Sequence, residues 1–132
     1  MIEQKRYDGE GMRVVYDGGD WVIGIKNYKV ANDISTLKTL ERHNKTDESF
    51  VLLEGACTLV AYDDTKEGPE ALALVQMEEH TVYTLLQGVW HTTIMKPYTK
   101  MVLIERSGTS MENSELLNLS DSLVRHVQDQ LT

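Results

Sequence analysis

The sequence has almost no cysteine, which limits how the fold can be held together. Cys57 is the single cysteine among 132 residues, so no intrachain disulfide can form, and the paired cysteines of structural zinc sites are absent. We therefore expect a protein of a reducing compartment, the cytoplasm. No nucleophile triad surrounds Cys57, so this residue is predicted to be a small buried hydrophobe.

Long apolar runs and clusters of positive charge are also missing. No stretch approaches the ~18 consecutive apolar residues of a membrane-spanning helix, and residues 1–10 contain no apolar run. Lys and Arg number 13 against 21 Asp and Glu, which gives a formal net charge of -8. Such a surface repels phosphate backbones and anionic lipid, so we expect no nucleic-acid and no membrane partner. A small molecule or another protein is the better candidate.

Short alternating runs make up most of the sequence, and they predict an all-β protein. A chain of 132 residues is long enough for one core, so we expect a single domain over residues 1–132. Turn residues separate the runs at roughly 8–12 residue spacing, which is typical of a β-sandwich or barrel. The first two predicted strands form an N-terminal hairpin, and the full set covers residues 12–16, 21–28, 49–54, 56–62, 71–77, 81–87, 89–95 and 100–106.

Two segments fall outside this strand pattern. Residues 32–42 are ambiguous, because Asp33 could cap a helix, whereas residues 36–43 also suit a strand, which we favour. Near the C-terminus, Ser120 is a plausible N-cap and Asp121 suits a first helical turn. Apolar residues then recur at helical spacing and predict a helix over residues 120–131, with an apolar face of Leu123, Val124, Val127 and Leu131.

Two histidines and two glutamates are placed where strands would bring them together. On a strand, residues two apart share a face, so Glu41 and His43 point the same way. A polar turn follows, and Glu48 opens the next strand with a carboxylate. Much later, a turn centred on Gly88 delivers His91 at the start of another strand.

The spacing of these residues resembles that of the cupin superfamily. The pattern Glu41-x-His43-x4-Glu48-x6-Gly55 is similar to the first cupin motif, H-x-H-x(3,4)-E-x6-G, with Glu in place of the first His. Gly88-x-x-His91 is similar to the core of the second motif, P-x-G-x-x-H. The sequence departs from this second motif because the Pro position holds Leu86 and Met95 stands where Asn often follows.

The resemblance implies a fold, a metal and an assembly. The fold would be a cupin-type double-stranded β-helix, or jelly-roll, with its barrel core over residues 12–106, an N-terminal hairpin and a short C-terminal helix. Cupins commonly bind one divalent transition metal, and the ligands carried over here would be His43, Glu48 and His91, with Glu41 as a fourth. Two imidazoles and a carboxylate suit Fe, Mn, Ni or Zn and leave positions open for substrate. A homodimer is also expected, with the N-terminal strands or the face around Trp21 as the contact.

Several residues near the motifs keep alternative interpretations. Glu41 could be a metal ligand, a general base, or a charge paired with a nearby Lys or Arg. Tyr83 could supply a proton, although the sequence does not orient its hydroxyl. Trp90 is interpreted as a core or interface residue rather than a stacking platform. His80 and His126 have no partners at ligand spacing, and we assign them no role.

Three functions remain open. The first is a metal-dependent enzyme that acts on a small polar metabolite, such as a sugar or a hydroxy or keto acid, by isomerase, epimerase or lyase chemistry. In that reading Glu41 or Tyr83 would move the proton. The second is a non-haem iron dioxygenase with the same ligands. The third is a non-catalytic sensor that binds a small molecule, because one fold hosts many activities.

Overall fold

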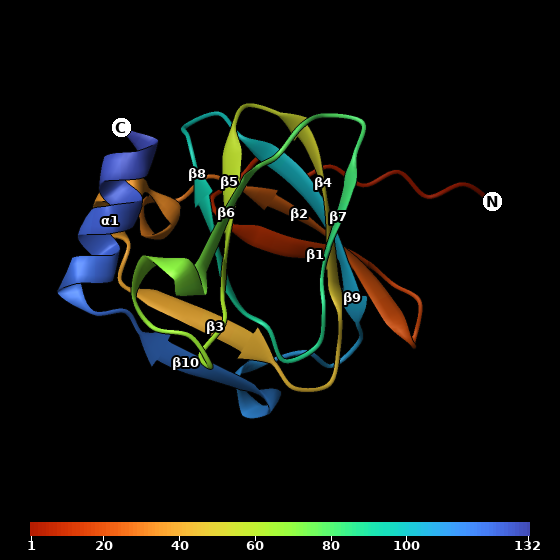
Figure 1. Ribbon diagram of the computed structural model, residues 1–132. Coiled ribbons are helices and arrows are strands. Elements are labelled where there is room, and N and C mark those ends of the chain that lie inside the picture. The colour runs from red at the N-terminus through yellow and green to blue at the C-terminus, as the bar shows by residue number, and fades with distance from the viewer.

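The computed structural model describes residues 1–132, and ten strands form two antiparallel sheets that face one another (Figure 1). The first sheet contains, in spatial order, β1 (Met12–Asp17), β2 (Trp21–Asn27), β9 (Lys100–Arg106), β4 (Glu48–Glu54) and β7 (Val82–Leu85). The second sheet contains β10 (Ser114–Asn118), β3 (Thr39–His43), β8 (Trp90–Met95), β5 (Cys57–Tyr62) and β6 (Leu72–Gln76). The predicted all-β class is therefore confirmed.

Helical segments are few and lie at the outside of the two sheets. Single turns of 3-10 helix occur at Val30–Asn32, Ile34–Thr36, Gly68–Ala71 and Met111–Asn113. The only α-helix is α1 (Asp121–Leu131), which begins after Ser120, whose hydroxyl accepts a hydrogen bond from the Leu123 N–H. The predicted C-terminal helix and its cap are confirmed. This helix lacks the length and the apolar content needed to span a membrane.

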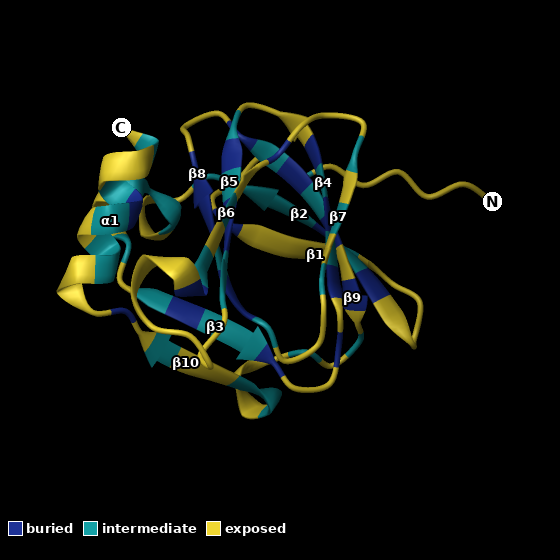
Figure 2. Ribbon diagram, in the orientation of Figure 1, coloured by how far each residue is buried: buried dark blue, intermediate teal, exposed yellow.

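Most buried residues lie on strands of the two sheets (Figure 2). The buried apolar residues form two layers, one on each side of the second sheet. The layer between the sheets contains Phe50, Leu52, Cys57, Leu59, Met77, Met95, Met101 and Leu103. The other layer lies between the second sheet and α1, and it contains Leu40, Val60, Trp90, Ile94, Leu119 and Val127. Alternation along each strand explains the division, because successive residues face opposite sides of the sheet.

The buried position of Cys57 matches its predicted role. Its side chain lies in the layer between the sheets and the residue is 2% exposed. Burial raises the pKa of the Cys57 thiol to about 12, because the thiolate would lose its hydration. The cysteine is a core residue.

Gly55 occupies the turn between β4 and β5 and needs to be glycine. Its φ of +85° lies in the left-handed region, and a Cβ there would sit 2.5 Å from the Thr99 Cα. The Thr99 hydroxyl also accepts a hydrogen bond from the Ala56 N–H and donates one to the Ala56 carbonyl. This close approach locks the β4–β5 turn onto the segment that leads into β9.

Two predictions for individual segments need correction. The strand predicted at residues 36–43 begins only at Thr39, because Asp33 caps a 3-10 turn at Ile34–Thr36 by accepting a hydrogen bond from the Ser35 N–H. The sequence pattern also missed β10, which pairs antiparallel with β3 along its whole length. The second sheet therefore includes residues beyond 106.

Candidate metal centre

Four strands deliver five acidic or imidazole side chains to one place between the sheets. Glu41 and His43 come from β3, and Glu41 pairs with His91 of β8 across the second sheet. Glu48 of β4 pairs with Glu105 of β9 across the first sheet. The two sheets face one another (Figure 1). The pairs meet between them, because Glu48 contacts both His43 and His91. Apart from Glu41, every member is at most 8% exposed.

Glu48 is at the centre of the cluster. Its Oε1 lies 3.1 Å from the Nε2 of His91 and 3.4 Å from the Nε2 of His43. The Oε1 of Glu41 lies 3.9 Å from the same His43 nitrogen. The two imidazole rings are 5.2 Å apart between centroids and tilted by 60°. Both rings therefore turn their Nε2 edges toward the carboxylate of Glu48.

The backbone fixes which nitrogen of His91 faces the cluster. Its Nδ1 lies 2.8 Å from the carbonyl oxygen of Val89, which can only accept a hydrogen bond. Nδ1 must therefore carry the proton, and in the neutral ring Nε2 presents a lone pair. That lone pair faces the Glu48 oxygen, a second acceptor. Two acceptors at this separation require a cation between them, either a proton or a metal ion.

His43 is oriented by a residue of β10. Its Nδ1 lies 2.8 Å from the hydroxyl oxygen of Ser114, its partner in the strand register. Its Nε2 is buried and has no hydrogen-bond partner, and the same holds for the Oε2 of Glu105. Orphaned buried polar atoms are rare because each costs the free energy of its lost hydration. Both orphaned atoms face the cluster, where a metal ion would satisfy them.

The charges of the cluster are strongly coupled. Burial would raise the pKa of Glu48, but contacts with His43, His91 and Glu105 outweigh it and hold that pKa well below its ordinary value. Burial and the neighbouring carboxylate of Glu48 raise the pKa of Glu105 to about 8. The contact with Glu48 raises the pKa of His43. The site therefore retains a negative Glu48 that favours a cation beside it.

These side chains suit a transition metal. Ligand atoms of Glu41, His43 and His91 lie within 4.8 Å of one another, and so do those of His43, Glu48 and Glu105. The donor set mixes imidazole and carboxylate, which suits Zn, Fe, Mn or Ni. Both imidazoles are also held through their outer nitrogens, as is usual for metal-binding histidines.

The cluster opens into two adjoining cavities. One, of about 260 Å³, is lined by cluster residues together with Lys26, Lys29 and Ser114. The other, of about 220 Å³, shares Lys26, Lys29 and Glu41 with the first and extends to Asn32. Both lie between the β1–β2 edge of one sheet and the β3–β10 edge of the other. A small polar molecule could therefore reach the cluster from this side.

The structure brings four of the predicted site residues together and separates the fifth. His43, Glu48, His91 and Glu41 all belong to the cluster. Tyr83 packs against the apolar layer between the sheets, and its hydroxyl accepts a hydrogen bond from the Glu78 N–H at 2.8 Å. Its side chain lines neither of the two cavities. The structure thus directs the Tyr83 hydroxyl to the β6–β7 connection instead of the metal centre.

Sequence reasoning missed Glu105, although a signal was present. In β9 the interior-facing positions are Met101, Leu103 and Glu105, so a carboxylate continues an apolar alternation. A charged residue in the buried register of a strand is unusual unless it is paired or functional. Glu105 could therefore have been recognised as a charged residue at a strand position that otherwise holds buried apolar residues.

Trp90, His80 and His126 lie outside the cluster, as the sequence analysis expected. Trp90 lies on the outer face of the second sheet, where the guanidinium of Arg42 sits 4.4 Å from the centre of its ring. It is a core residue of the α1 layer. His80 has a side chain that is 94% exposed, and His126 belongs to α1, so neither joins the cluster.

Comparisons with known proteins identify the fold. No protein-family model matches the sequence, and no curated protein is significantly similar to it. Among solved structures, a cupin-2 domain protein from Shewanella frigidimarina matches with a TM-score of 0.56 and 19% identity, over 76% of this chain and 84% of the other. The two-sheet architecture thus has a cupin counterpart. The chain has the cupin jelly-roll fold.

Two enzymes share this architecture at low sequence identity. The nucleoside dehydratase Pac13 matches with a TM-score of 0.60 and 7% identity, over 89% of this chain and 88% of the other. A Streptomyces Pac13 variant is similar in complex with uridine, with a TM-score of 0.60 and 8% identity over 92% and 96% of the two chains. Oxalate decarboxylase from Bacillus subtilis matches with a TM-score of 0.53 and 12% identity, over 74% of this chain and 24% of that longer one.

Proposed function

We propose that this protein is a metal-dependent cupin enzyme that transfers protons on a small polar metabolite, in an isomerase, epimerase or lyase reaction. His43, Glu48 and His91 hold one divalent metal, with Glu41 or Glu105 completing the set. The observation that carries this proposal is the pair of buried atoms without hydrogen-bond partners, His43 Nε2 and Glu105 Oε2, inside a cluster whose ligand atoms lie within 4.8 Å of one another. A bound divalent metal supplies a Lewis acid for a carbonyl or hydroxyl oxygen of the substrate.

Glu41 is the residue best placed to move a proton. It is the cluster's one partly exposed carboxylate and lines both cavities, so it faces the space that a substrate would fill. Its only ion-pair contact within 4 Å is with His43, at 3.9 Å. A carboxylate that is open to substrate and not held in a close Lys or Arg pair can accept and return a proton.

The other residues position these groups and close one side of the site. Ser114 and the Val89 carbonyl hold the two imidazoles by their outer nitrogens. The apolar layer around Phe50 and Leu103 closes the barrel behind the site. A site closed on one side strengthens the electrostatic interactions within it, because water cannot screen them.

Proton exchange tests the proposed chemistry directly. The protein is loaded with the metal that mass spectrometry finds in it, and lactate, pyruvate and aldose probes are followed by proton NMR in D2O. Exchange of a carbon-bound proton is expected in the wild type. Glu41→Gln should slow the exchange by about 10²–10⁴, since it removes a proton acceptor. The metal content of the variant, measured alongside, distinguishes the loss of a proton acceptor from the loss of a metal ligand. Glu54→Gln, which changes an exposed carboxylate of β4, is the matched control.

The outcomes separate the competing functions. Metal binding without exchange on any probe would favour the non-catalytic sensor. Oxygen consumption by the iron-loaded protein would favour the dioxygenase. A protein that binds none of Fe, Mn, Ni and Zn after reconstitution contradicts the metalloenzyme proposal altogether.

A further inference from the structure

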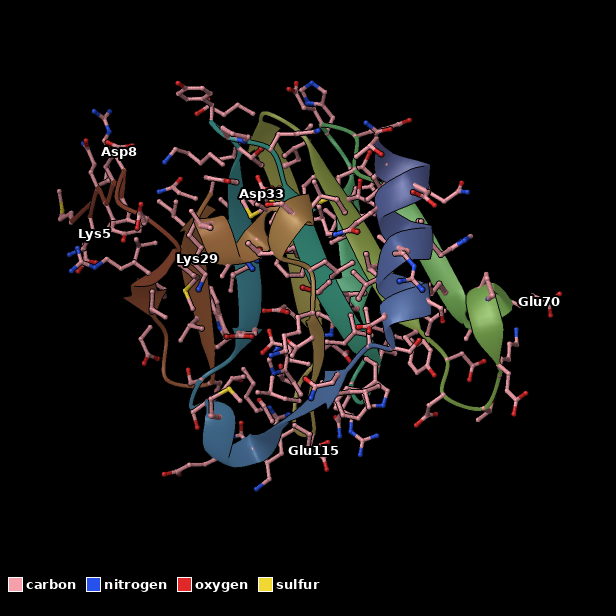
Figure 3. All side chains as sticks on the ribbon, turned by 90° about the vertical axis from the view of Figure 1, so that its left-hand side faces the viewer. Lys5, Asp8, Lys29, Asp33, Glu70 and Glu115 are labelled. Carbon is pink, nitrogen blue, oxygen red and sulfur yellow. The ribbon has the colours of Figure 1, made fainter.

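Lys26 is a charged residue on the interior face of β2. The preceding interior positions of this strand hold Val22 and Gly24, and Lys26 is paired with Met101, which is fully buried. Its side chain lines both cavities at the metal centre, together with Lys29. Lys29 follows β2 and is exposed. Figure 3 shows Lys29 and Asp33 on the same side of the molecule. One lysine is therefore inside the pocket and the other is at its mouth.

Neither amine has a partner within the protein. Among the lysine side chains, only those of Lys66 and Lys100 form hydrogen bonds or ion pairs. An ammonium that lines a pocket and has no partner in the protein is available to form a charge-assisted hydrogen bond with an anion there. Burial lowers the pKa of Lys26, and the carboxylates of Glu48 and Glu41 oppose this effect. A further anion beside the amine would, like those carboxylates, raise the pKa of Lys26 and favour its charged form.

A second unfilled polar atom lies in the same pocket. The side-chain amide of Asn32 donates to the carbonyl oxygen of Thr93 at 3.2 Å, but its Oδ1 is buried without a partner. Asn32 and Thr93 line the cavity that also contains both lysines. The Asp33 carboxylate, which also lines this cavity, is already engaged by Ser35 and Tyr28. The pocket therefore leaves both lysines without a direct ion pair and the Asn32 Oδ1 without a hydrogen-bond donor.

We propose that Lys26 and Lys29 bind the carboxylate of the substrate, and that a hydroxyl of the same molecule donates to the Oδ1 of Asn32. The substrate class is then a small hydroxy acid rather than a neutral sugar. This inference rests on the proposed function only in assuming that the reacting end of the molecule points to the metal centre.

Two lysines are needed here because the rest of the chain opposes an anion. The formal net charge is -8, and the carboxylates of Glu41 and Glu48 line the same cavity as the two lysines. A local pair of cations overcomes this background only at short range, since salt screens charges beyond about 10 Å. Recognition of a carboxylate thus depends on direct contact with Lys26 and Lys29, and long-range attraction contributes little.

Binding of a matched pair of probes tests the inference. Isothermal titration calorimetry compares lactate with lactamide, which has the same hydroxyl but an uncharged amide, on the metal-loaded protein. Wild type should bind lactate at least about tenfold more tightly, because a charge-assisted hydrogen bond is worth this much. Lys26→Met and Lys29→Met should each remove most of that preference, and Lys26→Arg should keep part of it. Lys66→Met, on a distant loop, is the control.

Metal content, measured by mass spectrometry on every variant, distinguishes this inference from the proposed function. Unchanged metal with equal binding of lactate and lactamide overturns the carboxylate site and leaves the metal centre standing. A protein that holds no metal but prefers lactate in a lysine-dependent way would overturn the metal centre and leave the carboxylate site standing. A borohydride-trapped pyruvate adduct on Lys26 would also overturn the inference, because the amine would then act as a nucleophile. Lys29→Met keeps the test valid if the interior Lys26→Met variant fails to fold.

Discussion

Ser114 should tune metal affinity without touching the metal. Ser114→Ala removes the hydroxyl that lies 2.8 Å from His43 Nδ1 and leaves a buried nitrogen without a partner. Loss of such an outer hydrogen bond typically weakens metal binding by about 10–100-fold. At about 1.4 kcal/mol for each factor of ten, this corresponds to roughly 1.4–2.8 kcal/mol. The metal-free protein should lose about 1 kcal/mol of stability, the usual net value of one hydrogen bond.

Competition with a chromogenic zinc chelator measures the change in affinity. Ser114→Thr keeps a hydroxyl and should restore most of the binding, whereas Ser49→Ala removes an exposed hydroxyl that bonds Thr84 and should have no effect. Urea titrations of the metal-free variants separate a loss of affinity from a loss of folding. If Ser114→Ala binds zinc within about twofold of wild type, the argument that β10 positions His43 is refuted.

Three other predictions concern the fold. Leu40 is 1% exposed beneath α1, so Leu40→Ala should lower the free energy of unfolding by about 2–5 kcal/mol in urea titrations, and a loss below about 1 kcal/mol would contradict the packing. Gly55→Ala should cost at least about 2 kcal/mol in the same assay, because it combines a left-handed φ with a clash against Thr99; a neutral effect would refute the turn geometry. Cys57, whose pKa is raised to about 12, should resist iodoacetamide near pH 8 until the protein unfolds, and rapid labelling of the native protein would show that it is accessible.

The strand pattern and the two motifs could be predicted because they depend on local alternation. Because residues two apart on a strand share a face, the sequence predicted that Glu41 and His43 point the same way. In the structure, the pairing of the strands brings Glu48 and His91 to the same place. β10 could not be predicted in this way. It is an edge strand of mixed polarity, with Leu116 59% exposed, so it lacks the alternation of a half-buried strand.

Contacts between distant segments account for the rest of what was missed. Ser114 meets His43 across 71 positions, and no short motif links the two residues. Lys26 lies one residue before the end of β2, where a lysine ordinarily faces solvent, and only the pairing of β2 with β9 turns it inward. Glu105 was open to prediction from the alternation of β9, because a carboxylate follows two buried apolar residues on one face. The homodimer remains a prediction, which light scattering in solution would test.

An anomalous-difference map from crystals of the metal-loaded protein tests the metal centre most directly. Data collected above and below the absorption edge of the metal found by mass spectrometry would locate the ion and identify its element. The account predicts one strong peak within about 2.0–2.3 Å of His43 Nε2, His91 Nε2 and a Glu48 oxygen. A map without a peak there, or with a peak only at surface residues such as His80, would contradict it.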